Sequence, residues 1–305
     1  MRVGNGKSHA KIILIGEHAV VYGTRAIAIP FFKTRCKASV RDSDEVKIVS
    51  GVYSGLLENA PSSMESIVSL IRELTRNLNL PKLEYIIESE IPISSGMGSS
   101  AAVASSIVEA VYDYLDLDLS DSSRFEWIQF SERIAHGNPS GIDALTTTHD
   151  DALLFQKGYG AVKFPSKLNA YLVVGQTGEP GNTKEAVSAV KRKVTEENKE
   201  HVINEIGVTV EECFEEYQNG NVEAVGKTLT KVQKKLKELD VSTPIIDEMV
   251  DLALESGALG AKLTGGGRGG CVIALARNNE DANKLKKAWE DYNNQESWIL
   301  NLNEV

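Results

Sequence analysis

The sequence has few cysteines, few prolines and few aromatic residues. Of its 305 residues, three are cysteine, eight are proline and 6% are aromatic. The cysteines are Cys36, Cys213 and Cys271, and no two of them have the spacing of a metal-binding or redox pair. We therefore expect free thiols in a reducing cytosol, and we exclude a small fold held together by disulfides.

The sequence also lacks a long hydrophobic run and an excess of positive charge. No stretch approaches the roughly 18 consecutive apolar residues of a membrane span, and the polar segment 1–9 has no signal-peptide hydrophobic region. Its 43 acidic and 33 basic residues give a formal net charge of −10. This charge argues against a broad nucleic-acid or anionic-membrane surface, although a pocket can still bind an anionic small molecule. We predict a cytoplasmic protein with no nucleic-acid or membrane partner.

The composition is that of an ordinary globular protein, with 42% hydrophobic and 25% charged residues. The length suggests one large or two ordinary domains, and we place a candidate boundary at Pro165, giving domains 1–165 and 166–305. Strand and helix patterns mix in both parts without strict βαβ alternation, so the predicted fold class is α+β. Apolar runs or alternation predict strands at 11–15, 26–40, 83–91, 152–164, 171–174, 261–263, 271–276 and 298–302. Helical periodicity predicts helices near 67–78, 103–115, 123–135, 183–239 (several), 244–256 and 283–292.

A glycine- and serine-rich loop lies between a predicted strand and a predicted helix. It consists of Ser94, Ser95, Gly96, Met97, Gly98, Ser99, Ser100 and Ala101. The first N–H groups of a helix lack internal partners and carry the positive end of its dipole, so a phosphate can bind there. We expect Ser99 and Ser100 to cap the helix, and a serine hydroxyl here can also reach a phosphate-bound Mg²⁺. The alternative is a plain serine-capped turn.

A second glycine-rich segment, residues 264–271, has five glycines in the six positions 265–270. Such a loop allows the backbone of Gly265 and Gly266 to approach a ligand closely, and Arg268 adds a positive charge for phosphate. The alternative is a mobile surface turn.

Two carboxylates flank the turn at residues 136–141. Glu132 and Asp143 are eleven residues apart across a Gly/Pro turn, so both could face one cleft. Each alone would be an ordinary surface charge. Phosphoryl transfer needs hydrogen-bond donors that hold the phosphates and a metal that bridges them. It also needs a cation for the developing charge and a group that takes the acceptor's proton. Ser99 or Ser100, Glu132, Lys11 or Arg268, and Asp143 could fill these roles.

Four segments resemble motifs of the GHMP small-molecule kinases, in the version found in mevalonate kinases. They are Lys11 with residues 16–23 (GEHAVVYG), residues 94–102, residues 136–143 (HGNPSGID) and residues 264–271. The segments occur in family order and span most of the chain. The first and third are specific, whereas the two glycine loops alone indicate only the superfamily.

The resemblance implies a fold, a reaction and a site. The fold would be an N-terminal ribosomal-protein-S5-like domain and a C-terminal ferredoxin-like domain, with ATP between them, in a homodimer. The reaction would be phosphorylation of the mevalonate 5-hydroxyl by ATP with Mg²⁺, in isoprenoid biosynthesis. Asp143 would accept the hydroxyl proton, and Lys11 would lower the pKa of that hydroxyl and steady the phosphoryl group. The remaining implied contacts are Ser100 and Glu132 for Mg²⁺, His18, Glu17, Ser140 and Thr183 for the acceptor, and residues 94–101, Gly265, Gly266 and Arg268 for ATP.

The chain departs from the usual motifs at a few positions, none of which is a catalytic group. Arg268, for instance, stands where many members have glycine. Other kinases of the superfamily, acting on phosphomevalonate, homoserine or a sugar, are alternatives that the HGN sequence before Asp143 disfavours. An ATP-dependent decarboxylase and a non-catalytic sensor are further alternatives, and the presence of Lys11 and Glu132 argues against both.

Overall fold

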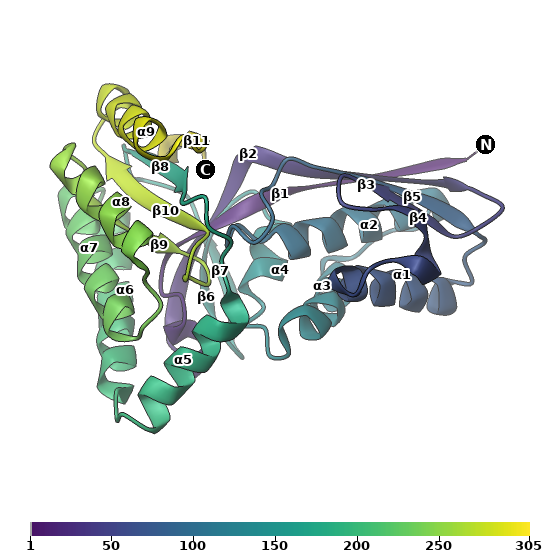
Figure 1. The fold of residues 1–305 in the computed structure, drawn as a ribbon, viewed down its shortest axis with the longest axis horizontal. Helices are drawn as coiled ribbons and strands as arrows, with labels where there is room; N and C mark the ends of the chain where they lie inside the picture. The colour runs from purple at the N-terminus through teal and green to yellow at the C-terminus, as the bar shows by residue number, and fades with distance from the viewer. Residues whose placement is uncertain (1) are drawn as a thin grey trace. The chain divides into compact units, whose positions relative to one another are not determined.

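The computed structural model describes residues 2–305 (Figure 1). These residues form two compact units. Unit 1 contains residues up to Ala10, Thr34–Pro92 and Gly98–Thr148, and unit 2 contains Lys11–Lys33, Ile93–Met97 and His149–Val305. Because each unit is discontinuous in sequence, the two units do not coincide with the stretches 1–165 and 166–305, and the boundary at Pro165 stays a prediction.

Unit 1 is a sheet with helices packed on one face (Figure 1). Its strand order is β4-β3-β5-β2, with β3 and β5 parallel and β2 and β5 antiparallel. The long strands β1 and β2 each contribute part of their length to this unit. Its elements are β1 (Val3–Ile15), β2 (Arg25–Asp42), β3 (Lys47–Ser50), β4 (Ser54–Leu56), β5 (Leu83–Ser89), α1 (Glu65–Leu78), α2 (Ser99–Leu115), α3 (Asp121–His136), α4 (Ile142–Thr146) and the 3-10 turns η2 (Leu57–Asn59) and η3 (Ser62–Met64).

Strand β1 begins eight residues before the predicted start at Lys11. Its inward positions near the start are Gly4 and Gly6, and a Cβ at either would lie 2.1 Å from a carbonyl oxygen of α2. The backbone N–H groups of Asn5 and Lys7 donate to carboxylates of α2, at 2.7 and 2.9 Å. The strand therefore fits only with glycine at these positions, and glycine does not register as an apolar residue in the sequence pattern.

Unit 2 is built on a four-stranded antiparallel sheet of order β11-β8-β10-β9, against which α7, α8 and α9 pack. The central strand β10 is buried along its whole length, and the first residues of β2 pair with β6, which pairs with β7. Its elements are η1 (Ala19–Tyr22), β6 (Ala152–Gln156), β7 (Gly160–Phe164), β8 (Tyr171–Gln176), α5 (Thr183–Thr195), α6 (Glu200–Gln218), α7 (Val222–Glu238), α8 (Pro244–Glu255), β9 (Gly260–Thr264), β10 (Cys271–Ala276), α9 (Asn279–Asn293), β11 (Ser297–Asn301) and η4 (Leu302–Glu304).

The predicted helical run 183–239 consists of α5, α6 and α7. The breaks contain Asn198 and Gly220, both in the left-handed region with φ of 55° and 72°. Helix α9 starts at Asn279, four residues before the predicted start, because the Asn278 side chain caps it by accepting from Asp281 N at 2.9 Å.

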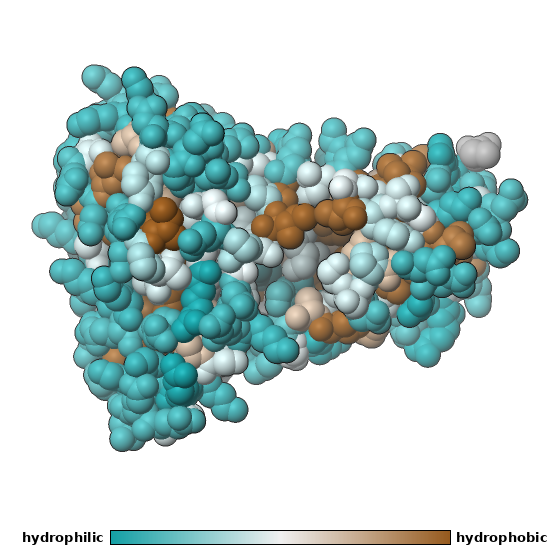
Figure 2. Space-filling model, viewed as in Figure 1, coloured by the Kyte–Doolittle hydropathy of each residue, from teal (hydrophilic) through white to brown (hydrophobic). Residues whose placement is uncertain are grey.

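The surface is largely hydrophilic on the face drawn in Figure 2, where hydrophobic residues form scattered groups. Among residues 2–305, no helix is both long enough and apolar enough to cross a membrane.

Candidate functional site

The first glycine loop ends at the start of α2. Gly96 and Gly98 have φ of 78° and 75°, in the left-handed region. Gly98 is the N-cap of α2 and no side chain caps the helix there, so the prediction that Ser99 and Ser100 cap it is wrong. Both serines lie in the first turn instead. A glycine cap leaves the first N–H groups of the helix without a side-chain acceptor, which is the arrangement that binds an anion.

Ser100 and Glu132 are in direct contact within unit 1. The Ser100 hydroxyl donates to Glu132 Oε1 at 2.6 Å, and His136 Nε2 lies 3.7 Å from the other carboxylate oxygen. The Glu132 side chain is only 3% exposed. A buried carboxylate aimed at a hydroxyl offers two hard oxygen donors, which suit Mg²⁺. Within 2–305 no cluster of three or more His, Cys, Asp or Glu could hold a metal.

Asp143 is half-buried in the first turn of the short helix α4. Gly141 begins this helix with φ of 96°, and a Cβ there would lie 2.8 Å from Gln129 Nε2 of α3. The Ser140 hydroxyl accepts from Ile142 N at 3.3 Å, at the start of the same helix. Helices α2, α3 and α4 contact one another. Unit 1 therefore packs together the three helices that carry Ser100, Glu132 and Asp143.

In unit 2, Glu17 forms a buried ion pair with Lys262 of β9. Lys262 Nζ donates to Glu17 Oε1 and to Leu263 O, and the two side chains are 1% and 0% exposed. Burial raises the pKa of Glu17 and lowers the pKa of Lys262, and each partner opposes the shift of the other. The nearby ammonium of Lys11 favours the ionised form of Glu17. The ion pair with Lys262 is enough to explain why Glu17 is buried. The contact of Glu17 with substrate therefore stays a prediction.

Sequence reasoning missed Lys262. Its signal was a lysine in an otherwise apolar strand directly before a glycine loop, a position where a charge requires a partner.

His18 links the first motif to the third. It has φ of 62°, and its Nε2 donates to Gly266 O at 3.0 Å. Burial lowers the pKa of His18 to about 4, so the ring is neutral at pH 7. Because a carbonyl can only accept, the proton is on Nε2 and Nδ1 is left as an acceptor.

The second glycine-rich segment is enclosed by other backbone segments and is not a free surface turn. A Cβ at Gly265 would lie 2.6 Å from Gly96 O, and a Cβ at Gly266 would lie 2.4 Å from the Thr183 hydroxyl. The Gly181 N–H also donates to Ser94 O at 2.7 Å. The two glycine loops and the start of α5 therefore meet within unit 2, where only glycine leaves room for the backbone.

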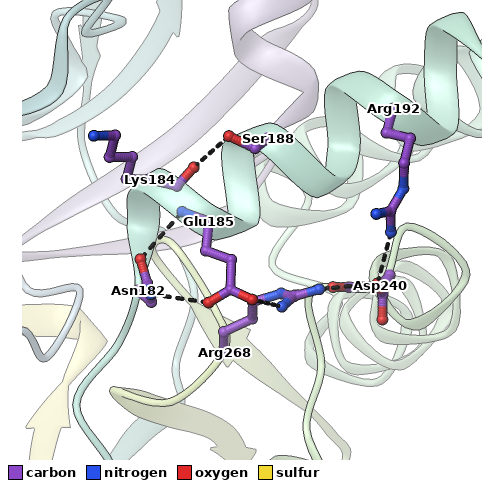
Figure 3. Close-up of polar contacts among 7 residues, drawn as sticks. All are labelled: Asn182, Lys184, Glu185, Ser188, Arg192, Asp240 and Arg268. Atoms are coloured by element: carbon purple, nitrogen blue, oxygen red, sulfur yellow. Dashed lines mark hydrogen bonds and ion pairs between the residues drawn. The ribbon is translucent and has the colours of Figure 1, made fainter.

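Arg268 does not present a free charge to phosphate. Its guanidinium donates to the carboxylates of Glu185 and Asp240 (Figure 3). Arg268 is thus already paired with two carboxylates in the free protein, and its contact with ATP stays a prediction.

Two family models match this chain. The family model described as the GHMP kinases N-terminal domain matches residues 65–150, and the model of the C-terminal domain matches residues 211–295. A mevalonate kinase of Thermococcus sibiricus is 33% identical over 311 residues, covering 92% of this chain and 91% of the relative. The chain belongs to the GHMP kinase family. Another relative, the mevalonate kinase of Archaeoglobus fulgidus, is 33% identical to this GHMP kinase over 266 residues and 87% of its length, with 89% of the relative covered.

Solved structures of the family have the same fold. Mevalonate kinase from methicillin-resistant Staphylococcus aureus is 35% identical, with a TM-score of 0.75, covering 99% of this GHMP kinase and 100% of that chain. The Methanococcus jannaschii mevalonate kinase is 28% identical, with a TM-score of 0.83, covering 97% of this GHMP kinase and 96% of that chain. A Streptococcus pneumoniae phosphomevalonate kinase, solved with phosphomevalonate and AMPPNP, is only 20% identical. Its TM-score is nevertheless 0.84, covering 97% of this GHMP kinase and 99% of that chain. The expected α+β, two-domain GHMP kinase fold is confirmed, and the family implies an enzyme that uses ATP.

Proposed function

We propose that this GHMP kinase transfers the γ-phosphoryl group of ATP to the 5-hydroxyl of mevalonate, as a step of isoprenoid biosynthesis. The observation that carries the chemistry is the buried Ser100–Glu132 pair at the first turn of α2, on helices packed with the helix of Asp143. The choice of acceptor rests on the relatives named mevalonate kinase at 33% identity. The fold alone does not distinguish mevalonate from other acceptors, because a phosphomevalonate kinase superposes equally well.

Backbone groups account for nucleotide binding in this proposal. The uncovered N–H groups at the start of α2 receive phosphate oxygens. Ser95 and Met97 are buried, so they contribute through the backbone. Ser94 completes the loop, and Ser99 and Ala101 belong to the first turn of α2. Gly265 and Gly266 let the second glycine loop approach the nucleotide closely.

Ser100 and Glu132 hold Mg²⁺ in this proposal. The ion would supply positive charge that offsets the negative charge developing on the phosphate groups. The chain supplies one hydroxyl and one buried carboxylate, already hydrogen-bonded to each other.

Asp143 accepts the proton of the acceptor hydroxyl, and Lys11 stabilises the negative charge that develops as the phosphoryl group arrives. An ionised aspartate is a weak base for an alcohol, so the proton moves late in the reaction. On the acceptor side we place Thr183, Ser140 and the neutral ring of His18, whose Nδ1 can accept from a substrate hydroxyl. We also place Glu17, paired with Lys262, on the acceptor side.

Replacing Glu132 by glutamine is expected to weaken Mg²⁺ use. The amide keeps the size of the side chain and still accepts from Ser100, but it removes the negative charge that holds the ion. We expect the Mg²⁺ concentration for half-maximal activity to rise about tenfold or more. Glu126→Gln, an exposed carboxylate on the same helix, is the matched control. An unchanged Mg²⁺ dependence in Glu132→Gln would remove Glu132 from the metal site.

The proposed reaction is tested by measuring ADP release with Mg²⁺·ATP and each of mevalonate, phosphomevalonate, homoserine and galactose. We expect release that depends on mevalonate alone. Release with another acceptor would move the substrate assignment, and CO₂ production would indicate a decarboxylase. If no acceptor gave ADP release while calorimetry showed that the protein binds nucleotide, the result would favour the non-catalytic sensor. Light scattering tests the homodimer that the resemblance implies.

A further inference from the structure

Arg268 interrupts a run of glycines and adopts a backbone conformation that disfavours any residue but glycine. Its φ is 55°, in the left-handed region. Its N–H donates to Val241 O at 2.8 Å, so the backbone here bonds to the turn between α7 and α8. Asp240 in that turn is also left-handed, with φ of 62°. Two left-handed residues therefore lie close together, and side-chain contacts add to the backbone bond between these segments.

The side chain of Arg268 provides those contacts (Figure 3). Nε donates to Asp240 O at 3.1 Å, Nη2 donates to the Asp240 carboxylate at 2.9 Å, and Nη1 donates to Glu185. Arg192 lies 3.5 Å from the same Asp240 carboxylate. A single exposed ion pair contributes little to stability, but a planar guanidinium that joins two carboxylates and a carbonyl is a network with fixed geometry.

Glu185 connects this network to the start of α5. Its backbone N–H donates to the Asn182 side chain at 3.1 Å, and the Asn182 amide donates back to its carboxylate at 2.9 Å. Asn182 thereby caps α5, whose first residue is Thr183. The Thr183 hydroxyl lies against Gly266 of the glycine loop. The contacts form a closed circuit from Arg268 through Glu185 and Asn182 to Thr183, and back to the loop at Gly266.

We propose that Arg268 is a positioning residue. Through its bonds to Glu185 and Asp240, which we call the latch, it holds the second glycine loop and the first turn of α5 in the register that binds nucleotide and acceptor. Five glycines give this loop many accessible conformations, and the latch selects one of them. The inference rests on the proposed function for the identity of the two ligands, but the latch itself belongs to the free protein.

Hydrogen exchange of the free protein tests the latch without any ligand. In Arg268→Met we expect amide exchange in peptides covering 264–270 and 181–188 to become at least roughly threefold faster, because local opening becomes easier. Arg277→Met is the matched control, since Arg277 pairs with Glu223 at another exposed site. Unchanged exchange in both peptides, or equal acceleration by the control, would overturn the latch.

Ligand affinity tests what the latch does. We expect Arg268→Met to raise the Kd for ADP, and the KM for ATP and for mevalonate, by roughly 3- to 10-fold, with a smaller change in kcat. Asp240→Asn should reproduce this effect, and the double variant Arg268→Met/Asp240→Asn should be no worse than Arg268→Met alone. If instead Arg268 contacted phosphate, Asp240→Asn would bind ADP normally, and this result would overturn the proposal. If the wild-type protein failed to phosphorylate mevalonate, the proposed function would be wrong. Hydrogen exchange and ADP affinity would still show whether the latch exists.

Discussion

Replacing Asp143 by asparagine is expected to leave a folded protein whose kcat with mevalonate is lower by roughly 10²–10⁴-fold, the range for loss of a general base. Asparagine has the same shape but cannot accept the proton of the hydroxyl. The fold should tolerate the change, because asparagine keeps the size of the side chain and the backbone bonds of α4 are unaffected. The backbone oxygen of Asp143 accepts from Thr147 N and Oγ1 at 3.1 and 2.9 Å, and both bonds remain in the variant.

Steady-state turnover of the purified Asp143→Asn variant, with ADP binding measured in parallel, checks this prediction. ADP affinity should stay within about threefold of wild type, since the base does not hold the nucleotide. Asp151→Asn, which changes an exposed aspartate paired with Lys163, should retain normal turnover. Near-normal turnover in Asp143→Asn would refute the assignment of Asp143 as the base.

Replacing Lys262 by methionine is expected to lower the free energy of unfolding by about 3–5 kcal/mol, because it leaves the buried carboxylate of Glu17 without a partner. Lys231→Met, which breaks the exposed pair with Glu212, should cost less than about 1 kcal/mol. The double variant Glu17→Gln/Lys262→Met should recover part of the loss, since it removes the uncompensated charge. Urea-induced unfolding of the four proteins, including wild type, measures these differences.

The defect of Lys262→Met should also depend on pH. Burial already raises the pKa of Glu17, and the substitution removes the ammonium that opposes this shift most strongly, leaving the smaller effect of Lys11. The folded variant then binds the Glu17 proton more tightly than the unfolded chain does, so its deficit relative to wild type should shrink as the pH falls from 8 to 5. A variant as stable as Lys231→Met at every pH would show that the pair does not support the fold.

The elements that sequence patterns predicted best are those whose signal is local. The amphipathic helix α1 and the strands β9 and β10 appear where their hydrophobic spacing places them. Strand β1 was predicted too short, because Gly4 and Gly6 face α2 and carry no hydrophobic signal. The cap of α2 was assigned to serines because serine is a common N-cap, whereas Gly98 in a left-handed conformation takes that position.

The sequence by itself determined the family, since motifs such as GEHAVVYG and HGNPSGID require only neighbouring residues to be read. The resemblance also implied that Ser100 and Glu132 act together on Mg²⁺, and the two are in contact although they are 32 residues apart. Only the tertiary structure decided which charged side chains form ion pairs with one another. Glu17 pairs with Lys262 across 245 residues and Arg268 with Glu185 across 83, so no local pattern records either contact. The physical reason is that a buried or networked charge is stabilised by the partner that the fold brings to it, and that partner can come from any part of the chain.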